Sequence, residues 1–148
     1  MKRLFFNFLI LITLTFHCDL FSQSFIVNTI VIDPGHGGKD PGNLGTGRYK
    51  ETEKDITLSV ALKLGNLLKE NIPTINIVYT REDDSYPTLL DRANLANSVE
   101  ADLFISIHCD AFKSKSAYGS SSFVMGLDYT DENLRMAQKE NSSIYLEE

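Results

Sequence analysis

Two histidines, His36 and His108, each stand where a run of apolar residues gives way to a loop. Taken alone, either one reads most simply as a surface histidine or as a hydrogen-bonded core histidine. Two parallel strands that lie close together in a sheet, however, bring their carboxyl ends to the same rim. Imidazole is a common zinc ligand. We therefore expect His36 and His108 to lie together and to form part of a metal site.

Glu53 is the carboxylate expected to complete this site. Zinc hydrolases commonly use two neutral imidazoles and one carboxylate, and they leave the fourth position to water. Glu53 lies in the first turn of a predicted helix and shares a helical face with Ile56 and Val60, so its side chain should point inward. Glu51 precedes the helix and should point outward. The alternative for Glu53 is an acid that complements the positive end of the helix dipole.

The segment around His36 is rich in glycine, with Gly35, Gly37 and Gly38 beside it. Such a segment could cradle a phosphate, but its spacing fits neither a P-loop nor a dinucleotide-binding fingerprint, and no helix begins directly after Gly38. A tight turn that carries His36 toward a metal is the better interpretation, because glycine adopts backbone conformations that other residues avoid.

Alternating strand and helix patterns position these residues. Residues 25–32 are rich in Ile and Val and predict a first strand. Thr52, with Asp55 three positions later, predicts the start of an amphipathic helix of about four to five turns. Pro73 ends this helix. Residues 74–80 then alternate as a second strand.

The second half of the chain continues the alternation. Thr88 and Asp91 repeat the capping-box spacing and predict a second helix. Residues 103–107 predict a strand that is buried on both faces of a parallel sheet. Residues 119–125 predict a fourth strand, and Thr130 with the acids after it predicts a third helix.

This order of elements predicts an α/β fold, in which a single domain holds a mainly parallel or mixed sheet with helices on both faces. A chain of 148 residues with 43% hydrophobic and 23% charged residues suits one globular domain. Ligand sites in such sheets lie beyond the carboxyl ends of the strands. His36 and His108 fall at two of these ends.

Residues 1–24 have the pattern of a secretory signal peptide. Lys2 and Arg3 precede an apolar run over residues 4–16, which is shorter than the roughly 20 residues of a membrane-spanning helix. We expect cleavage near residue 24, export to a periplasmic or extracellular location, and no integral membrane segment afterwards. Cys18 raises the alternative of a lipoprotein, but His17 stands before it where a small residue is usual.

The chain is acidic, with a formal net charge of −6 at pH 7, and it stays acidic without the signal peptide. An acidic surface argues against nucleic acid as a partner. Cys109 is the only cysteine left after cleavage, so an internal disulfide is excluded and the fold depends on its core.

Several of these segments together resemble one known family, the zinc-dependent N-acetylmuramoyl-L-alanine amidases of type 3. The match covers nearly all of the chain after the signal peptide, and its motifs follow the order found in the family. The segments that carry it are Ile32–Gly42 with Asp33-Pro34-Gly35-His36-Gly37-Gly38, Glu53–Ile56, Thr80-Arg81, and Arg92–Ala111 with Ser106-Ile107-His108-Cys109-Asp110-Ala111.

The resemblance implies Zn²⁺ as the cofactor, with His36, Glu53 and His108 as its ligands, and an amidase catalytic domain over residues 25–148. It implies peptidoglycan or muropeptides as the substrate. The bond cleaved is the amide between N-acetylmuramic acid and L-alanine, in cell-wall turnover and daughter-cell separation. The sequence leaves open whether a protein activator takes part.

One departure from the family concerns the catalytic residue. The resemblance implies a second glutamate near the C-terminus, in a Val-Glu-x-Gly-Phe-like setting, and this sequence has no such setting. The catalytic residue is therefore unknown at this point, and we expect the catalytic domain to be incomplete at its C-terminus. Glu140, Glu147 and Glu148 are available acids, but each lies in or beside a predicted helix.

Three hypotheses from different classes follow. The first is the zinc-dependent amidase. The second is a non-catalytic peptidoglycan-binding module, or an inactive fragment, that keeps the zinc site. The third is a phosphate-binding α/β protein. Zinc content separates the third hypothesis from the other two, and turnover of muramyl peptides separates the first from the second.

Overall fold

The computed structural model describes residues 26–45, 50–109, 118–124 and 131–147. The signal-peptide prediction for residues 1–24 lies outside these ranges. In chain order, the elements are β1 (Thr29–Pro34), α2 (Glu53–Asn71), β2 (Asn76–Tyr79), α3 (Leu89–Ser98), β3 (Leu103–Ile107), α4 (Asp131–Glu140) and the 3₁₀-helix η1 (Asn141–Leu146).

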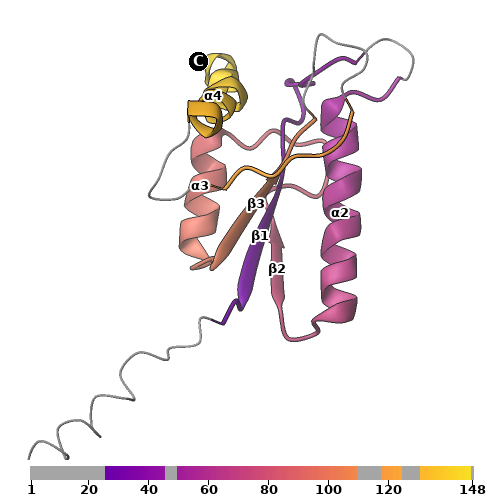
Figure 1. The fold of residues 1–148 in the computed structure, drawn as a ribbon, viewed down its shortest axis with the longest axis vertical. Helices are drawn as coiled ribbons and strands as arrows, with labels where there is room; N and C mark the ends of the chain where they lie inside the picture. The colour runs from indigo at the N-terminus through magenta and orange to yellow at the C-terminus, as the bar shows by residue number, and fades with distance from the viewer. Residues whose placement is uncertain (1–25, 46–49, 110–117, 125–130, 148) are drawn as a thin grey trace, which may run out of the picture.

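The three strands form one parallel sheet in the order β2-β1-β3. The chain passes from β1 through α2 to β2 on one side, and then returns across β1 through α3 to reach β3. Right-handed crossovers in opposite directions put their helices on opposite faces of the sheet. Figure 1 shows this arrangement, with α2 on one side of the strands and α3 on the other. The predicted α/β fold with a parallel sheet is confirmed.

The core lies between the sheet and α2. It consists of Ile30, Ile32, Ala61 and Ile77, with partly buried side chains packed around them. The buried stripe of α2 is Glu53, Thr57, Ala61 and Gly65, at intervals of four residues. Small residues in this stripe let the helix lie close to the strands.

Two side chains of α2 were expected on that buried face and are not. Ile56 is 43% exposed and Val60 is 45% exposed. Glu53 does point inward, at 5% exposure, but it shares its face with Thr57. Residues four apart lie on one face of a helix, so Glu53 shares its face with Thr57, Ala61 and Gly65. This face lies against the sheet because its small side chains let the helix come closest to the strands.

Both predicted helix starts have the expected caps. The backbone N–H of Thr52 donates to Asp55 at the start of α2, at 2.9 Å. At the start of α3, the backbone N–H of Thr88 donates to Asp91 at 3.1 Å, and the N–H of Asp91 donates back to the Thr88 hydroxyl at 3.1 Å. These bonds satisfy donors that a helix leaves unpaired in its first turn.

The predicted burial of β3 on both faces is wrong. Its bounds agree with the prediction, but Leu103 is 43% exposed and Phe104 is 42% exposed. In the part of the chain that the structure describes, β3 pairs with β1 alone, so its other edge is unpaired.

The fourth strand predicted over residues 119–125 is also wrong for residues 119–124, which form no strand; Met125 lies outside the described residues. Val124 is 76% exposed. A β-prone sequence becomes a strand only where a partner strand and an apolar face receive it. The third predicted helix is present as α4, and among the described helices none has the length and apolar character needed to span a membrane.

Candidate metal centre

His36 and His108 meet because their strands are neighbours. The register of β1 and β3 pairs Pro34 with Ile107, so His36 and His108 leave the sheet side by side. His108 Nδ1 lies 3.2 Å from His36 Nε2, and the two rings are nearly perpendicular, with centroids 4.9 Å apart. The expectation that strand topology brings these imidazoles together agrees with the structure.

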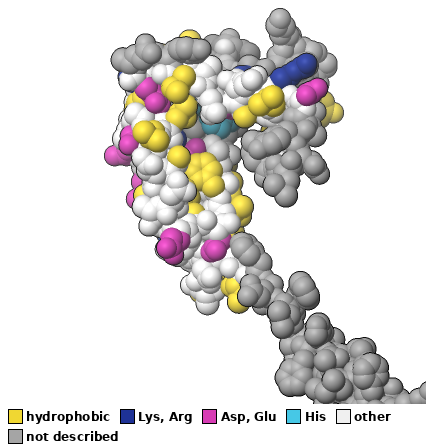
Figure 2. All heavy atoms as spheres, turned by 90° about the vertical axis from the view of Figure 1, so that its left-hand side faces the viewer, with side chains coloured by type: hydrophobic (Ala, Val, Ile, Leu, Met, Phe, Trp, Pro, Cys, Tyr) yellow, Lys and Arg dark blue, Asp and Glu magenta, His cyan; other side chains and the backbone are white. Residues whose placement is uncertain are grey.

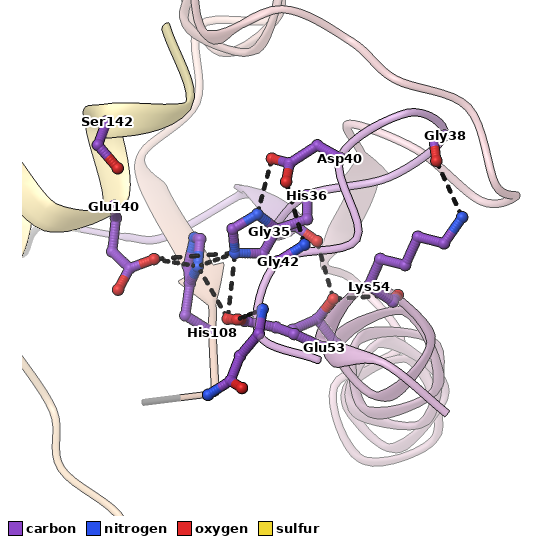
Figure 3. A network of polar contacts seen from close by, with 12 residues as sticks. Gly35, His36, Gly38, Asp40, Gly42, Glu53, Lys54, His108, Glu140 and Ser142 are labelled. Carbon is purple, nitrogen blue, oxygen red and sulfur yellow. Dashed lines mark hydrogen bonds and ion pairs between the residues drawn. The ribbon is translucent and has the colours of Figure 1, made fainter. Parts of the chain in front are cut away.

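Glu53 points between the two imidazoles from the first residue of α2, as Figure 3 shows. Its Oε1 lies 3.2 Å from His36 Nε2 and 3.3 Å from His108 Nδ1. The backbone N–H of Cys109 donates to Oε1 at 2.6 Å, and that of Asn43 donates to Oε2 at 2.8 Å. Glu51 is exposed, as expected.

The three donor atoms are nearly equidistant, since all three separations are 3.2 or 3.3 Å. Two ligand atoms bound at 2.0–2.1 Å to a tetrahedral zinc ion are roughly 3.3 Å apart. Two imidazole nitrogens and one carboxylate oxygen are also a donor set that zinc accepts. The residues present therefore fit a zinc ion in both chemistry and spacing.

Glu140, the last residue of α4, brings a fourth donor group to the cluster, a second carboxylate. Its Oε2 lies 2.7 Å from His108 Nδ1 and 3.8 Å from His36 Nε2. Donor atoms of His36, Glu53, His108 and Glu140 all lie within 4.8 Å of one another. Sequence reasoning named Glu140 only as an available helical acid, because nothing in the local pattern says where α4 packs.

Asp40 was not singled out from the sequence, although it holds His36. The ring of His36 contacts Asp40 Oδ2 through Nδ1 at 2.8 Å, which leaves Nε2 directed at Glu53 and His108. Asp40 is 6% exposed, and its Oδ1 accepts the backbone N–H of Gly42 at 3.0 Å. A carboxylate behind a ligand histidine fixes the tautomer and the ring orientation. The signal available in the sequence was an acid four residues after His36 in the same tight loop.

Two glycines of this loop are required because candidate ligand side chains lie very close to their backbone. A Cβ at Gly35 would lie 2.4 Å from the His108 ring. One at Gly42, where φ is +63°, would lie 2.6 Å from the His36 ring and 2.8 Å from Glu53. Both positions therefore need glycine because the candidate ligands pack directly on the backbone. This agrees with the interpretation of the segment as a turn around His36.

Charges in the cluster shift the ionisation of its members. Burial opposes the charged form of His108, but Glu140 and Glu53 outweigh it and raise the pKa of the imidazole to about 9. The pKa of His36 is raised for the same reasons, with Glu53 and Asp40 outweighing burial. Burial also opposes ionisation of Glu53, yet the two imidazoles and two backbone N–H groups hold the pKa of its carboxyl well below its usual range.

The cluster opens into a pocket of about 460 Å³. Its lining includes His36, Glu53, Lys139, Glu140 and Ser142, and Figure 3 shows Glu140 and Ser142 across from His36 and Glu53. Histidine atoms are visible from solvent in a recess of the molecular surface in Figure 2. The volume is in the range of small-molecule sites. A small molecule can therefore reach His36 and Glu53 from the pocket.

Comparison with known proteins finds a family and several relatives that this chain resembles. The model of a family described as N-acetylmuramoyl-L-alanine amidase matches residues 30–146. The chain is 38% identical over 116 residues to N-acetylmuramoyl-L-alanine amidase AmiC of Escherichia coli O6:H1, covering 77% of this chain and 27% of AmiC. It is 44% identical over 82 residues to a sporulation-specific N-acetylmuramoyl-L-alanine amidase of Bacillus subtilis, covering 55% of this chain and 31% of that protein.

Solved structures agree with the sequence comparisons. The catalytic domain of CwlV, an amidase of Bacillus (Paenibacillus) polymyxa, matches with a TM-score of 0.56 and 40% identity over 61% of this chain and 49% of that chain. An amidase of Clostridium difficile 630 matches with a TM-score of 0.55 and 42% identity, over 62% of this chain and 48% of that chain. The chain thus spans about half of these solved chains and less than a third of the curated relatives above.

Proposed function

The chain belongs to the N-acetylmuramoyl-L-alanine amidase family, and we propose that it is a zinc-dependent hydrolase of peptidoglycan. The bond cleaved is the amide between N-acetylmuramic acid and the L-alanine of the stem peptide. The substrate class follows from the names of the relatives, which are amidases of this bond. Cell-wall turnover and daughter-cell separation are the processes that this activity serves.

The observation that carries the proposal is the equal spacing of three donor atoms. His36 Nε2, Glu53 Oε1 and His108 Nδ1 lie 3.2–3.3 Å from one another, and His36 and Glu53 line a pocket. A hydrogen-bonded core histidine or a helix-capping acid has no need of this mutual spacing. The phosphate-binding alternative loses its support, because the glycine loop packs on the imidazole rings and on Glu53.

In this mechanism His36, Glu53 and His108 would hold a zinc ion, which would supply Lewis acidity for polarising the scissile carbonyl and for lowering the pKa of a water molecule. Asp40 accepts the Nδ1 hydrogen of His36 and so keeps Nε2 free as a donor atom. Glu140 takes up the proton that the attacking water releases and passes it to the amine nitrogen as the C–N bond breaks. Its Oε2 lies 2.7 Å from His108 Nδ1 and 3.8 Å from His36 Nε2, so this carboxylate stands beside the place where the ion would bind.

The same glutamate also supports the second hypothesis, a binding module with a closed metal site. Catalytic zinc sites keep one open position, whereas structural sites have four protein ligands. If Glu140 takes the fourth position, the centre binds zinc but leaves no room for water. The two roles of Glu140 predict opposite effects of removing its charge.

The deciding experiment measures zinc content and the release of free L-alanine amino groups from purified muropeptides, for the wild type and for Glu140→Gln. If Glu140 carries the proton, Glu140→Gln keeps its zinc and loses on the order of 10²–10⁴-fold in rate. If Glu140 closes the site, the same variant becomes more active than the wild type. Asp131→Asn, an exposed acid on the same helix, is the control and should match the wild type. Absence of stoichiometric zinc in the wild type would refute the proposal as a whole.

We propose that the chain is exported, with residues 1–24 as a cleaved signal peptide and residues 25–148 as the catalytic domain. Lys2, Arg3 and the apolar run over residues 4–16 support this. N-terminal sequencing of the exported protein should begin between about Ser22 and Phe25, since small residues favour cleavage there. An intact Met1 on a cytoplasmic product would contradict it.

A further inference from the structure

Two buried arginines lie behind the candidate ligands and bind the backbone that carries His36. Arg92 donates to the carbonyl of Pro34 at 2.9 Å and to the carbonyl of His36 at 2.8 Å. Arg81 donates to Pro34 at 3.0 Å and to Gly35 at 2.8 Å. Three consecutive carbonyl groups thus accept hydrogen bonds from two guanidinium groups, which are 3% (Arg81) and 6% (Arg92) exposed.

The backbone at His36 needs such support. His36 has a φ of +63°, in the left-handed region that residues other than glycine rarely adopt. A conformation of this kind persists where surrounding contacts determine it, and it is found at functional sites. The hydrogen bond from Arg92 to the His36 carbonyl fixes the peptide that follows this residue. It therefore acts on the direction in which the imidazole leaves the chain.

Arg81 connects the same loop to the helix of Glu53. Its guanidinium also donates to the carbonyl of Lys54 at 2.8 Å and to the hydroxyl of Thr57 at 3.2 Å, in the first turns of α2. The Thr57 hydroxyl in turn lies 2.9 Å from the carbonyl of Gly35. One side chain thus sets the distance between the two segments that supply His36 and Glu53.

Arg92 is itself held by a buried acid. Asp33 pairs with Arg92 Nη1 at 2.6 Å and accepts the hydroxyls of Thr80 at 2.6 Å and Ser106 at 2.7 Å. These partners follow β2 or lie in β3, while Asp33 lies in β1. The acid therefore ties Arg92 to all three strands, which gives the guanidinium a fixed position relative to the sheet.

We propose that Arg81 and Arg92 are positioning residues, whose planar guanidinium groups set the spacing of His36 and Glu53 and thereby the affinity of the centre for its metal. The inference rests on the proposed zinc site for its metal readout, but the conformation of the loop can be measured without metal. Two buried charges that served stability alone would not need to bind, between them, three successive carbonyl groups of a ligand loop.

The test uses Arg92→Lys, which keeps the charge beside Asp33 but lacks the planar fork that reaches two carbonyl groups. We expect the zinc dissociation constant to rise by about 10–100-fold, as is typical when an outer partner of a metal ligand is lost. Ile77→Val and Ile77→Ala are the controls, because Ile77 is a buried core residue of β2 that is paired with Ile30, four residues before Pro34 at the end of β1. They lower stability and should leave the dissociation constant unchanged.

A second readout is amide hydrogen exchange in the metal-free protein. Gly37 and Asp40 exchange backbone hydrogen bonds at 2.9 Å across the loop, and both amides should exchange faster in Arg92→Lys. The amide of Asn76, bonded to Asn28 at the far end of the sheet, should not change. If Arg92→Lys does not fold, Arg81→Lys carries the same test, since Arg81 binds two of the three carbonyl groups.

The outcomes separate this inference from the proposed function. If the wild type binds no zinc, the proposed metal centre is refuted. If the loop amides nevertheless exchange faster in Arg92→Lys, the role of the arginines in positioning the loop is still supported. Zinc affinity and loop exchange equal to wild type in the folded variant would overturn the positioning role alone. An increase in the dissociation constant that also occurs in Ile77→Ala would overturn it as well, because the effect would then follow stability.

Discussion

The three candidate ligands are held in different ways. His36 is fixed by Asp40 behind its ring, and Glu53 is fixed by two backbone N–H groups. His108 rests against the backbone of Gly35, where a Cβ would clash with its ring. Each side chain therefore has little freedom to rotate, and little conformational entropy remains to be lost when a metal binds.

The carboxylate assignment gives the first prediction. Glu53→Ala should lose stoichiometric zinc, because it removes one of three equidistant donors. Glu51→Ala should keep its zinc, because Glu51 is exposed and precedes α2. Metal analysis of the purified variants checks both. Retention of zinc by Glu53→Ala together with its loss from Glu51→Ala would show that the wrong acid was assigned.

Asp40 gives the second prediction. Asp40→Ala should bind zinc about 10–100-fold more weakly, because His36 loses the carboxylate that orients its ring. Competition with a chelating dye measures this. Glu82→Gln is the charge-matched control, since Glu82 is an exposed acid outside the pocket lining. An equal loss of affinity in both variants would mean that only the overall negative charge matters.

At the scale of elements, local patterns predicted most boundaries because local physics sets them. Thr52 and Thr88 cap their helices through acids three residues on, and this spacing is visible in the sequence. The exposure of Phe104 was not predictable, because burial of a strand depends on which neighbours cover it. Glu140 at the site was not predictable either, since its position depends on how α4 packs against segments far away in the chain.

The contact between α2 and β2 gives the third prediction. Gly65 lies on the buried stripe of the helix, and a Cβ there would be 1.7 Å from the Tyr79 hydroxyl and 2.6 Å from its ring. Gly→Ala in a helix interior normally stabilises by about 1 kcal/mol. Gly65→Ala should instead destabilise by about 1–3 kcal/mol through overpacking. Urea unfolding measures it, with Asn66→Ala, exposed and adjacent, as the control for propensity. A stabilising Gly65→Ala would show that the Tyr79 side chain, or the helix, moves aside at little cost.

At the scale of the whole molecule, the candidate ligands lie on three segments that only the fold brings together. His36 follows β1, Glu53 opens α2 and His108 follows β3. A metal that needs all three donors binds the folded chain and not the unfolded one. Binding must therefore add to the free energy of unfolding, by an amount that depends only on the free zinc concentration relative to the dissociation constant.

The fourth prediction follows from this linkage. Zinc at about 100 times its dissociation constant should raise the free energy of unfolding by about 2.7 kcal/mol, and a chelator should remove the gain. The chain holds 20 Asp and Glu residues, which can bind zinc weakly elsewhere, so a variant must identify the source of the effect. His108→Ala should lose the zinc-dependent gain, and Glu51→Ala should keep it, because only the first lacks a donor of the three-atom set. Thermal or urea unfolding with and without zinc gives the answer. If His108→Ala is stabilised by zinc as strongly as the wild type, the metal that stabilises the fold is bound outside this centre.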